Sequence, residues 1–515
     1  MNRPSRLAGA FAGWRPFGWL RRSVSPTAAV TVPGALAWVD EFIANVRPYV
    51  VVRLEDNLLI RMPNQAHKLN SEGARILDFL LGGGRIAEIV ARINTGSGNN
   101  VDDHGNGLSH PLRDVALFLD AVRRCLSGEL REDTVTCAVE VRPLEVRFSD
   151  LPVLSEVAVT GRCNLRCVFC YAGCAGTCSR SPDSVDGPEA LIMTTAQVKT
   201  VLKRIRNQAR VPSVSFTGGE PTLRADLPEL VAFASKDLGM RANLITNGTL
   251  VSGQSAKALA DAGLASAQVS IEGPEATVHD RVTQVEGSFE KSCRAVAHFQ
   301  DVGITVHCNT TINRRNVDAV AKMPAFARDR LGLERLSMNM VIPAGSASQG
   351  ATALDLPLIR YTDMAPVILA VQRTAALVDV EFMWYSPTPL CLFNPITADL
   401  GNKGCSACDG LLSVDYQGRI LPCSSCDDPM GDLLREDFWT IWNRPASTAY
   451  RDKGLAHPSC RGCDHFAFCH GGCPLYWRHF GFGELEAIKG FPAHPAPDIP
   501  FSPSSPLLSS RKGEP

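Results

Sequence analysis

Three cysteines at the end of an apolar run constrain this chain more than any other feature. Cys163, Cys167 and Cys170 form a CxxxCxxC block directly after the stretch 151–160, whose apolar residues suit a buried strand. Only three thiolates of such a block can reach one metal centre, so a four-iron cubane bound there keeps one iron without a protein ligand. The spacing therefore predicts a cluster with an open iron, held in the loop after a strand.

Zinc or a group of buried free thiols is the alternative interpretation of this block. Zinc in structural sites takes four ligands, commonly from CxxC pairs. The spacing fixes no fourth ligand, although Cys174 and Cys178 lie nearby in the sequence. Because these two thiols have no derivable role, we interpret them as loop cysteines.

Apolar runs and helical stretches alternate after the cysteine block. Strand-like runs at 211–216, 242–245 and 267–271 each end in glycine or polar residues, and helical stretches cover 195–208 and 227–238. This alternation predicts an α/β fold with parallel strands and helices outside. In barrels of this kind, ligands and catalytic groups gather at the carboxyl ends of the strands.

The motifs CNLRCVFC, TGGEP, ITNGT and VSIEGP stand at these strand ends, and with them the stretch 150–345 resembles the radical S-adenosylmethionine superfamily. The resemblance implies a partial (β/α)6 TIM-like barrel that holds a [4Fe-4S] cluster and S-adenosyl-L-methionine. It also implies reductive cleavage of that cofactor to a 5'-deoxyadenosyl radical, which takes a hydrogen atom from the substrate.

The same resemblance implies roles for individual residues. The metal ligands are Cys163, Cys167 and Cys170. Gly218, Gly219 and Glu220 are expected to hold the methionine amino group, and Phe169 is expected to lie near the adenine. Asn247 and Ser270 are the candidates for further polar contacts.

The C-terminal cysteines resemble the SPASM extension over residues 385–487, which carries one or two auxiliary iron-sulfur clusters. For one cluster the resemblance implies Cys405 or Cys408 together with Cys423 and Cys473, with Cys391 as a further ligand; for a second it implies Cys460, Cys463 and Cys469. No cysteine follows Cys473, so the second cluster lacks an obvious fourth ligand. Cys426, Glu484 or Glu486 could fill the place, or one iron stays open; structural zinc is the alternative for the region.

Residues 41–130 form the third predicted domain, with no catalytic cluster of its own. A hairpin over 50–52 and 58–62 precedes helices at 72–81, 86–93 and 115–122. The pattern resembles the small winged-helix-like leader-peptide-recognition domain typified by the peptide chaperone of pyrroloquinoline quinone biosynthesis, which takes a peptide onto a sheet edge. A generic packing domain is the alternative, and the absence of a basic stripe argues against nucleic-acid binding.

Composition agrees with a large enzyme of the cytoplasm. The 515 residues are 45% hydrophobic, with 52 basic against 53 acidic side chains, and no apolar run reaches the length of an integral membrane segment. The 18 cysteines need a reducing compartment if they bind clusters. Residues 1–40 are expected to form a disordered basic tail, and residues 488–515 a proline-rich disordered tail.

The sequence thus predicts a radical S-adenosylmethionine peptide maturase. Its expected partners are a ribosomally synthesised precursor peptide and a reductant such as flavodoxin or ferredoxin. The resemblance to SPASM enzymes implies that auxiliary clusters take up a further electron, so it favours crosslink or thioether formation over epimerisation. Two alternatives stay open: a sulfatase-maturating enzyme that forms formylglycine, and a non-catalytic metal- and peptide-binding adaptor.

Overall fold

The chain forms two compact units, residues 1–142 and 143–515. The computed structural model describes residues 31–62, 65–96, 110–127, 149–172, 192–348 and 356–497. Most of the two expected tails, together with Cys174 and Cys178, lies outside the described residues. Within those residues, no helix is both long and apolar enough to cross a bilayer.

The N-terminal unit is a three-stranded antiparallel sheet packed with helices. The sheet order is β1-β2-β3, and its first two strands confirm the predicted hairpin. Its elements are α1 (Val39–Val46), β1 (Val50–Arg53), β2 (Leu58–Arg61), β3 (Gln65–Lys68), α2 (Ser71–Leu81), α3 (Ile86–Gly96) and α4 (His110–Ser127). A buried ion pair between Arg53 and Asp56, 2.8 Å long, fixes the turn between β1 and β2.

This unit begins earlier than residue 41. Leu36, in the short 3-10 helix Gly34–Leu36, and Val39 are both fully buried in the core of the unit. The last residues assigned to the N-terminal tail are therefore ordered, because their apolar side chains have a core to enter.

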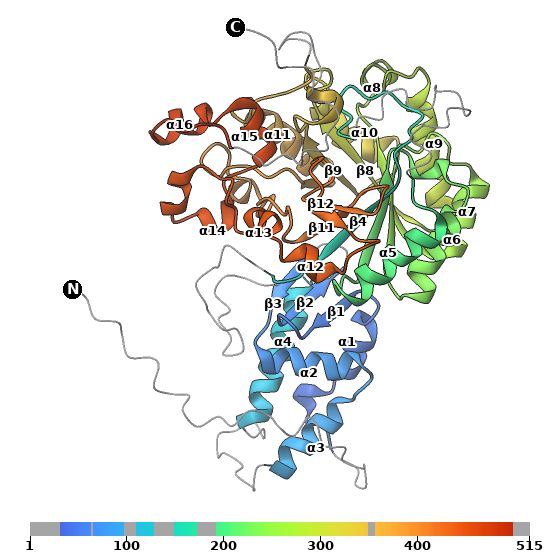
Figure 1. The fold of residues 1–515 in the computed structure, drawn as a ribbon. Coiled ribbons are helices and arrows are strands. Elements are labelled where there is room, and N and C mark those ends of the chain that lie inside the picture. The colour runs from blue at the N-terminus through green and yellow to red at the C-terminus, as the bar shows by residue number, and fades with distance from the viewer. Residues whose placement is uncertain are drawn as a thin grey trace. The chain divides into compact units, whose positions relative to one another are not determined.

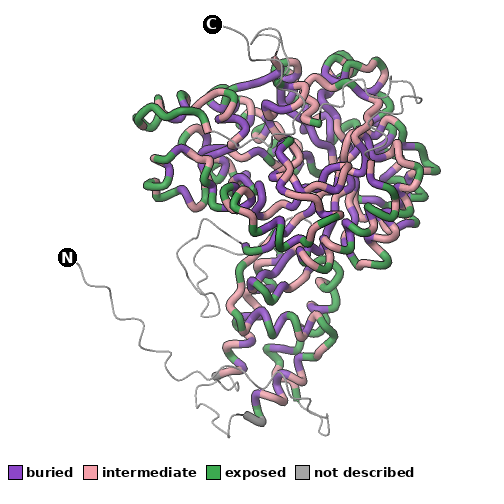
Figure 2. The backbone as a smooth tube through the Cα atoms, in the orientation of Figure 1, coloured by how far each residue is buried: buried purple, intermediate pink, exposed green. Residues whose placement is uncertain are grey.

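The second unit is built on one ten-stranded sheet (Figure 1). Strands β4 to β9 pair in parallel and in chain order, as expected for a partial (β/α)6 barrel. They are β4 (Leu154–Thr160), β5 (Ser213–Gly218), β6 (Arg241–Thr246), β7 (Leu264–Ser270), β8 (Thr305–Ile312) and β9 (Arg335–Met340). Figure 2 shows buried residues concentrated in the interior of this unit.

Helices connect these strands and cover the sheet. They are α5 (Thr195–Asn207), α6 (Leu227–Ala232, continued by a π-helical turn, Phe233–Asp237), α7 (Gly253–Ala262), α8 (Ala276–Thr283), α9 (Ser288–Asp301), α10 (Met323–Asp329) and α11 (Tyr361–Leu377). Capping boxes at Thr194 and Ser252 set the starts of α5 and α7.

The C-terminal region continues the barrel sheet instead of forming a separate one. Strand β10 (Glu381–Trp384) adds beside β9, and β11 (Leu411–Val414) adds in parallel beside β4. The antiparallel strands β12 (Arg419–Leu421) and β13 (Gly431–Asp432) follow. The remaining helices are α12 (Phe438–Trp442), α13 (Pro445–Arg451), α14 (Phe466–Cys469), α15 (Pro474–Phe480) and α16 (Gly483–Lys489). One hydrophobic core is shared by the barrel and this region.

Candidate active site and cysteine clusters

The predicted cluster cysteines lie in the loop that follows β4. Two backbone amides fix this loop against α8: Arg166 donates to Thr283 at 3.0 Å and Val168 donates to Val282 at 3.1 Å. The pKa of Cys167 is raised well above its usual range, first by burial and then by Glu272, Cys170 and Cys163. The fold therefore brings the three thiols together at the carboxyl end of the barrel strands.

Two glycines let the loop after β5 approach the cysteine loop. A Cβ on Gly218, whose φ is +137°, would lie 2.3 Å from the carbonyl oxygen of Thr160, and a Cβ on Gly219 would lie 2.0 Å from that of Arg162. Instead, the Gly219 amide donates to the Thr160 carbonyl at 2.8 Å. Glycine is required here for backbone-to-backbone packing, since no side chain fits the gap.

Glu220 joins the loops that follow β5 and β6. The carboxylate is fully buried and accepts hydrogen bonds from the Thr222 amide (3.0 Å), the Thr222 hydroxyl (2.5 Å), the Thr246 hydroxyl (2.7 Å) and the Asn247 amide (2.8 Å). Burial raises its pKa, and these donors oppose the rise. Hydrogen-bond donors of the protein thus satisfy the Glu220 carboxylate, which holds both loops in place.

Asn247 reaches from the β6 loop to the cysteine loop. Its side-chain nitrogen donates to Asn164 Oδ1 at 3.0 Å and lies 3.8 Å from the sulfur of Cys163. Its side-chain oxygen accepts from the Thr249 amide and hydroxyl. Asn247 therefore contacts one of the predicted cluster ligands directly.

Phe169 and Ser270 belong to different segments of the barrel. Phe169 is partly buried and packs against the small apolar cluster of Val341, Ala347 and Leu358, which follows β9. Ser270 ends β7, is half-buried and pairs with Asn309 of β8.

Sequence reasoning missed Glu272, although it lies within the VSIEGP motif. Its carboxylate is buried and accepts from the Thr311 amide at 2.9 Å. Its own amide donates to Nδ1 of His279, at 3.0 Å. Burial raises the pKa of Glu272 to about 8 and lowers that of His279 to about 4. Its position beside Cys167 places an ionisable group near the cluster site, which only the fold reveals.

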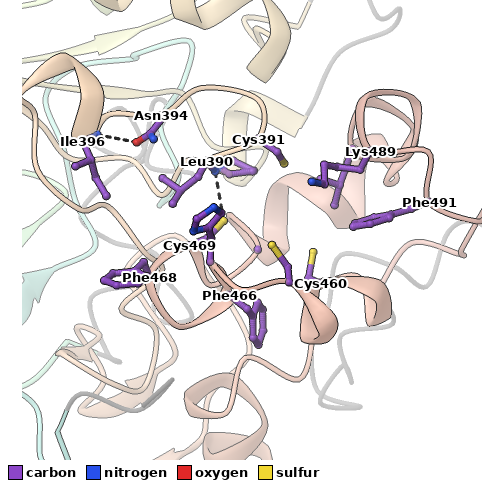
Figure 3. A pocket seen from close by; sticks show the side chains of 15 residues that line it. Leu390, Cys391, Asn394, Ile396, Cys460, Phe466, Phe468, Cys469, Lys489 and Phe491 are labelled. Carbon is purple, nitrogen blue, oxygen red and sulfur yellow. Dashed lines mark hydrogen bonds between the residues drawn. The ribbon is translucent and has the colours of Figure 1, made fainter. Parts of the chain in front are cut away.

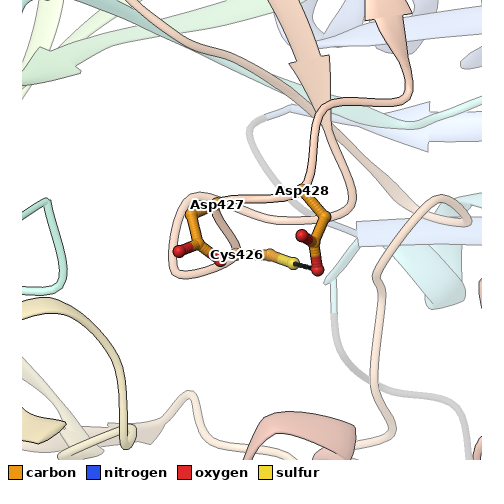
Figure 4. Close-up of side chains that lie close together, drawn as sticks. All are labelled: Cys426, Asp427 and Asp428. Atoms are coloured by element: carbon orange, nitrogen blue, oxygen red, sulfur yellow. Dashed lines mark hydrogen bonds between the residues drawn. The ribbon is translucent and has the colours of Figure 1, made fainter. Parts of the chain in front are cut away.

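The thiols are spaced too widely for a single zinc ion. A zinc tetrahedron with Zn–S bonds of about 2.3 Å has sulfurs about 3.8 Å apart. Among the described residues, the one group of ligand-type side chains with donor atoms all within 4.8 Å is Cys426, Asp427 and Asp428 (Figure 4). No set of three predicted cysteine ligands is that compact. Wider spacing suits a cluster in which each sulfur binds a different iron.

The first C-terminal cysteine group surrounds Cys423. The pKa of this thiol is raised well above its usual range, first by burial and then by Cys426, Cys473 and Cys405. Cys408 is fully buried and has a positive φ of 48°; burial raises its pKa to about 12, and the charges that act on it next are those of Arg451, which lowers it, and of Cys426 and Cys405, which raise it. Cys426 is therefore a neighbour of the first group, whereas the sequence analysis considered it only as a ligand of the second cluster.

The second C-terminal group lines a cavity of about 370 Å³ (Figure 3). The expected Cys460, Cys463 and Cys469 are joined there by Cys391. This placement differs from the expectation that Cys391 belongs with Cys423 and Cys473. Its segment follows β10, and the fold carries it to the other cysteine group.

Two family matches agree with this geometry. Residues 157–319 match the radical SAM superfamily, and residues 405–464 match SPASM, an iron-sulfur cluster-binding domain. These matches cover the barrel from β4 to β8 and most of the C-terminal cysteines. The first domain binds a [4Fe-4S] cluster and S-adenosylmethionine, and the second binds auxiliary clusters.

Individual relatives act on different substrates. An AdoMet-dependent heme synthase of Nitratidesulfovibrio vulgaris is 27% identical over 61% of this chain and 85% of its own length. A PqqA peptide cyclase of Bradyrhizobium diazoefficiens is 27% identical over 68% of this chain and 87% of its own. The structure of Streptococcus suis SuiB bound to its precursor peptide SuiA superposes with a TM-score of 0.57 at 16% identity, covering 83% of this chain and 94% of SuiB.

Proposed function

Since this chain is a radical S-adenosylmethionine enzyme with a SPASM iron-sulfur domain, we propose that it modifies a ribosomally synthesised precursor peptide. Crosslink or thioether formation is the favoured outcome. The N-terminal unit carries this proposal, because a small sheet with helices in the same chain as a radical barrel suits a peptide substrate that is held by a segment remote from its reacting residues.

Strand β3 is the edge on which we expect the peptide to add. Within the described residues it pairs only with β2. The Leu69 amide donates to the Asn57 carbonyl at 2.8 Å, so by strand alternation the amide of Ala66 points away from β2. This outward group can pair with an extended leader peptide, as in strand addition.

In the barrel, we propose that Cys163, Cys167 and Cys170 hold the cluster. The Gly218–Glu220 backbone faces the methionine amino group, while the Glu220 side chain fixes that loop. Phe169 lies toward the adenine, and Asn247 and Ser270 supply polar contacts. When bound, the cluster and S-adenosylmethionine supply a 5'-deoxyadenosyl radical.

For the first auxiliary cluster, we propose Cys405, Cys423 and Cys473 as ligands, with Cys426 as the neighbouring fourth thiol in preference to Cys408. The auxiliary clusters favour removal of a second electron from the peptide, which suits bond formation more than epimerisation. A flavodoxin or ferredoxin is the expected reductant. Since thiolate clusters persist in reducing compartments, we place the enzyme in the cytoplasm.

A porphyrin is the second candidate substrate, because AdoMet-dependent heme synthases are among the relatives. The two candidates separate in one assay. The enzyme is purified without oxygen, reduced with S-adenosylmethionine, and incubated either with the peptide encoded by a neighbouring short open reading frame or with iron-coproporphyrin III.

Formation of 5'-deoxyadenosine and loss of two hydrogens from the peptide would support the maturase. A variant with alanine at Cys163, Cys167 and Cys170 is the control and should form neither product. Conversion of the porphyrin with an unchanged peptide would overturn the proposal. If neither substrate changes while 5'-deoxyadenosine forms, the enzyme is a radical enzyme for another substrate, and the peptide proposal is again wrong.

A further inference from the structure

Four cysteines from separate segments converge on the cavity of Figure 3. Cys391 follows β10, Cys460 and Cys463 lie at the 3-10 helix Pro458–Gly462, and Cys469 ends α14. In Figure 3, the sulfurs of Cys391 and Cys460 point toward one another across the cavity. Such a set of four thiols around one space is what a fully ligated four-iron cluster requires.

We propose that Cys391 is the fourth ligand of the second auxiliary cluster. It thereby takes the place of the cysteine that the sequence lacks after Cys473. The ligand comes from upstream of the other three in the chain, so cysteine spacing within the C-terminal block does not reveal it.

Contacts within the cavity wall support this assignment. The amide of Leu390, next to Cys391, donates to the sulfur of Cys469 at 3.3 Å, and amide hydrogen bonds to sulfur are typical of cluster sites. Lys489 also lines the cavity. Its ammonium group compensates the negative charge that four thiolates would bring.

The other candidates for the fourth ligand are engaged elsewhere. Cys426 lies in the first auxiliary group, where its sulfur is 3.6 Å from the Tyr450 hydroxyl. Glu484 accepts hydrogen bonds from the hydroxyls of Thr362, at 2.7 Å, and Tyr476. Glu486 accepts from the His494 amide at 2.8 Å. None of these three is among the residues that line the cavity.

Ligation by Cys391 has a consequence for the reaction. With four cysteine ligands, the second auxiliary cluster has no iron open to substrate. It differs in this respect from the barrel cluster, which keeps one iron without a protein ligand. This inference depends on the SPASM domain alone and holds for either candidate substrate.

Thiol alkylation of the wild-type enzyme tests the proposal directly. Cys391 is exposed and should react with iodoacetamide in cluster-free protein. In anaerobically purified protein with a full iron and sulfide content, its modification should fall at least about 10-fold, as read by peptide mass spectrometry; metal coordination removes the thiolate from reaction. Cys125, a thiol of the N-terminal unit, is the internal control and should react equally in both forms. Equal modification of Cys391 in both forms would overturn the proposal.

A Cys391→Ala variant gives a second readout, with Cys125→Ala as the matched control. We expect the variant to lose up to about four irons per chain, or to keep them with an altered electron paramagnetic resonance signal from one auxiliary cluster. Circular dichroism confirms that the variant is folded. A folded Cys391→Ala protein with wild-type iron, sulfide and resonance signals would mean that another group completes the site.

Discussion

The side-chain nitrogen of Asn247 lies 3.8 Å from the sulfur of Cys163. The same nitrogen donates to Asn164, and the Asn247 amide donates to Glu220. Asn247, the residue directly after β6, therefore links the cysteine loop to the loop that follows β5. Residues that orient metal ligands in this way tune the site without coordinating the metal.

Replacing Asn247 with alanine should therefore slow S-adenosylmethionine cleavage about 10- to 100-fold, the usual cost of losing a contact to a metal ligand. The reduced enzyme is assayed for 5'-deoxyadenosine, and its iron content is measured in the same sample. Asn243→Ala is the control: it lies on the same strand, where its side chain accepts from Ser266 at 2.7 Å. Equal rates in the two variants would contradict the assigned role of Asn247.

Glu220→Gln should destabilise the barrel. The carboxylate accepts from Thr222, Thr246 and Asn247, and an amide places its own N–H₂ group against one of these donors. An unmatched buried polar pair lowers the free energy of unfolding by about 1–3 kcal/mol. Urea denaturation of the cluster-free protein measures this change. Glu229→Gln, at an exposed carboxylate, is the control and should change stability by less than about 0.5 kcal/mol.

Ala66→Pro on β3 should weaken peptide binding about 10-fold or more, because it removes an outward amide that strand addition requires. Ala66→Val keeps the amide and should bind like the wild type. Fluorescence anisotropy with the labelled leader peptide measures both affinities. Equal affinity of the proline and valine variants, with the circular dichroism of both unchanged, would exclude β3 as the docking edge.

The buried ion pair of Lys453 and Asp409 should stabilise the fold around the first auxiliary cysteines. The Lys453 ammonium lies 2.9 Å from the Asp409 carboxylate and donates to the Cys405 carbonyl at 2.7 Å; both side chains are almost fully buried. Lys453→Met leaves a buried carboxylate unpaired, which costs about 3–5 kcal/mol. Lys257→Met removes the lysine of an exposed ion pair and is the control. It should leave the melting temperature almost unchanged.

Stability should fall as the pH is lowered through the titration range of His307. Burial first, then the charge of Arg335, lowers the pKa of His307 to about 4, below its usual value of about 6.5. Between these values the unfolded chain binds the proton and the folded chain does not, so acid favours unfolding, by at most about 1.4 kcal/mol per pH unit. His307→Gln retains a polar partner for Gln268, which lies 3.2 Å from the ring. It should show a smaller loss of stability between pH 7 and 5 in denaturant titrations, and an unchanged loss would contradict the assignment.

The sequence alone predicted the architecture of the barrel. The strand-end motifs combine local hydrophobic periodicity with short fixed spacings, and both are properties of neighbouring residues. For this reason the parallel strands β4 to β7 and the hairpin of β1 and β2 could be placed before the fold was known. Strand β3 was missed, because only four residues form it and two of them are exposed.

Tertiary structure decided which distant groups share a site. The motifs located Cys163, Cys167 and Cys170 because one loop carries all three. No spacing rule could unite Cys391 with Cys460, or Glu272 with Cys167, since each pair is joined by packing of segments far apart in the chain. Local sequence encodes ligands that a single loop supplies, whereas ligands from different elements are fixed only when the shared core forms.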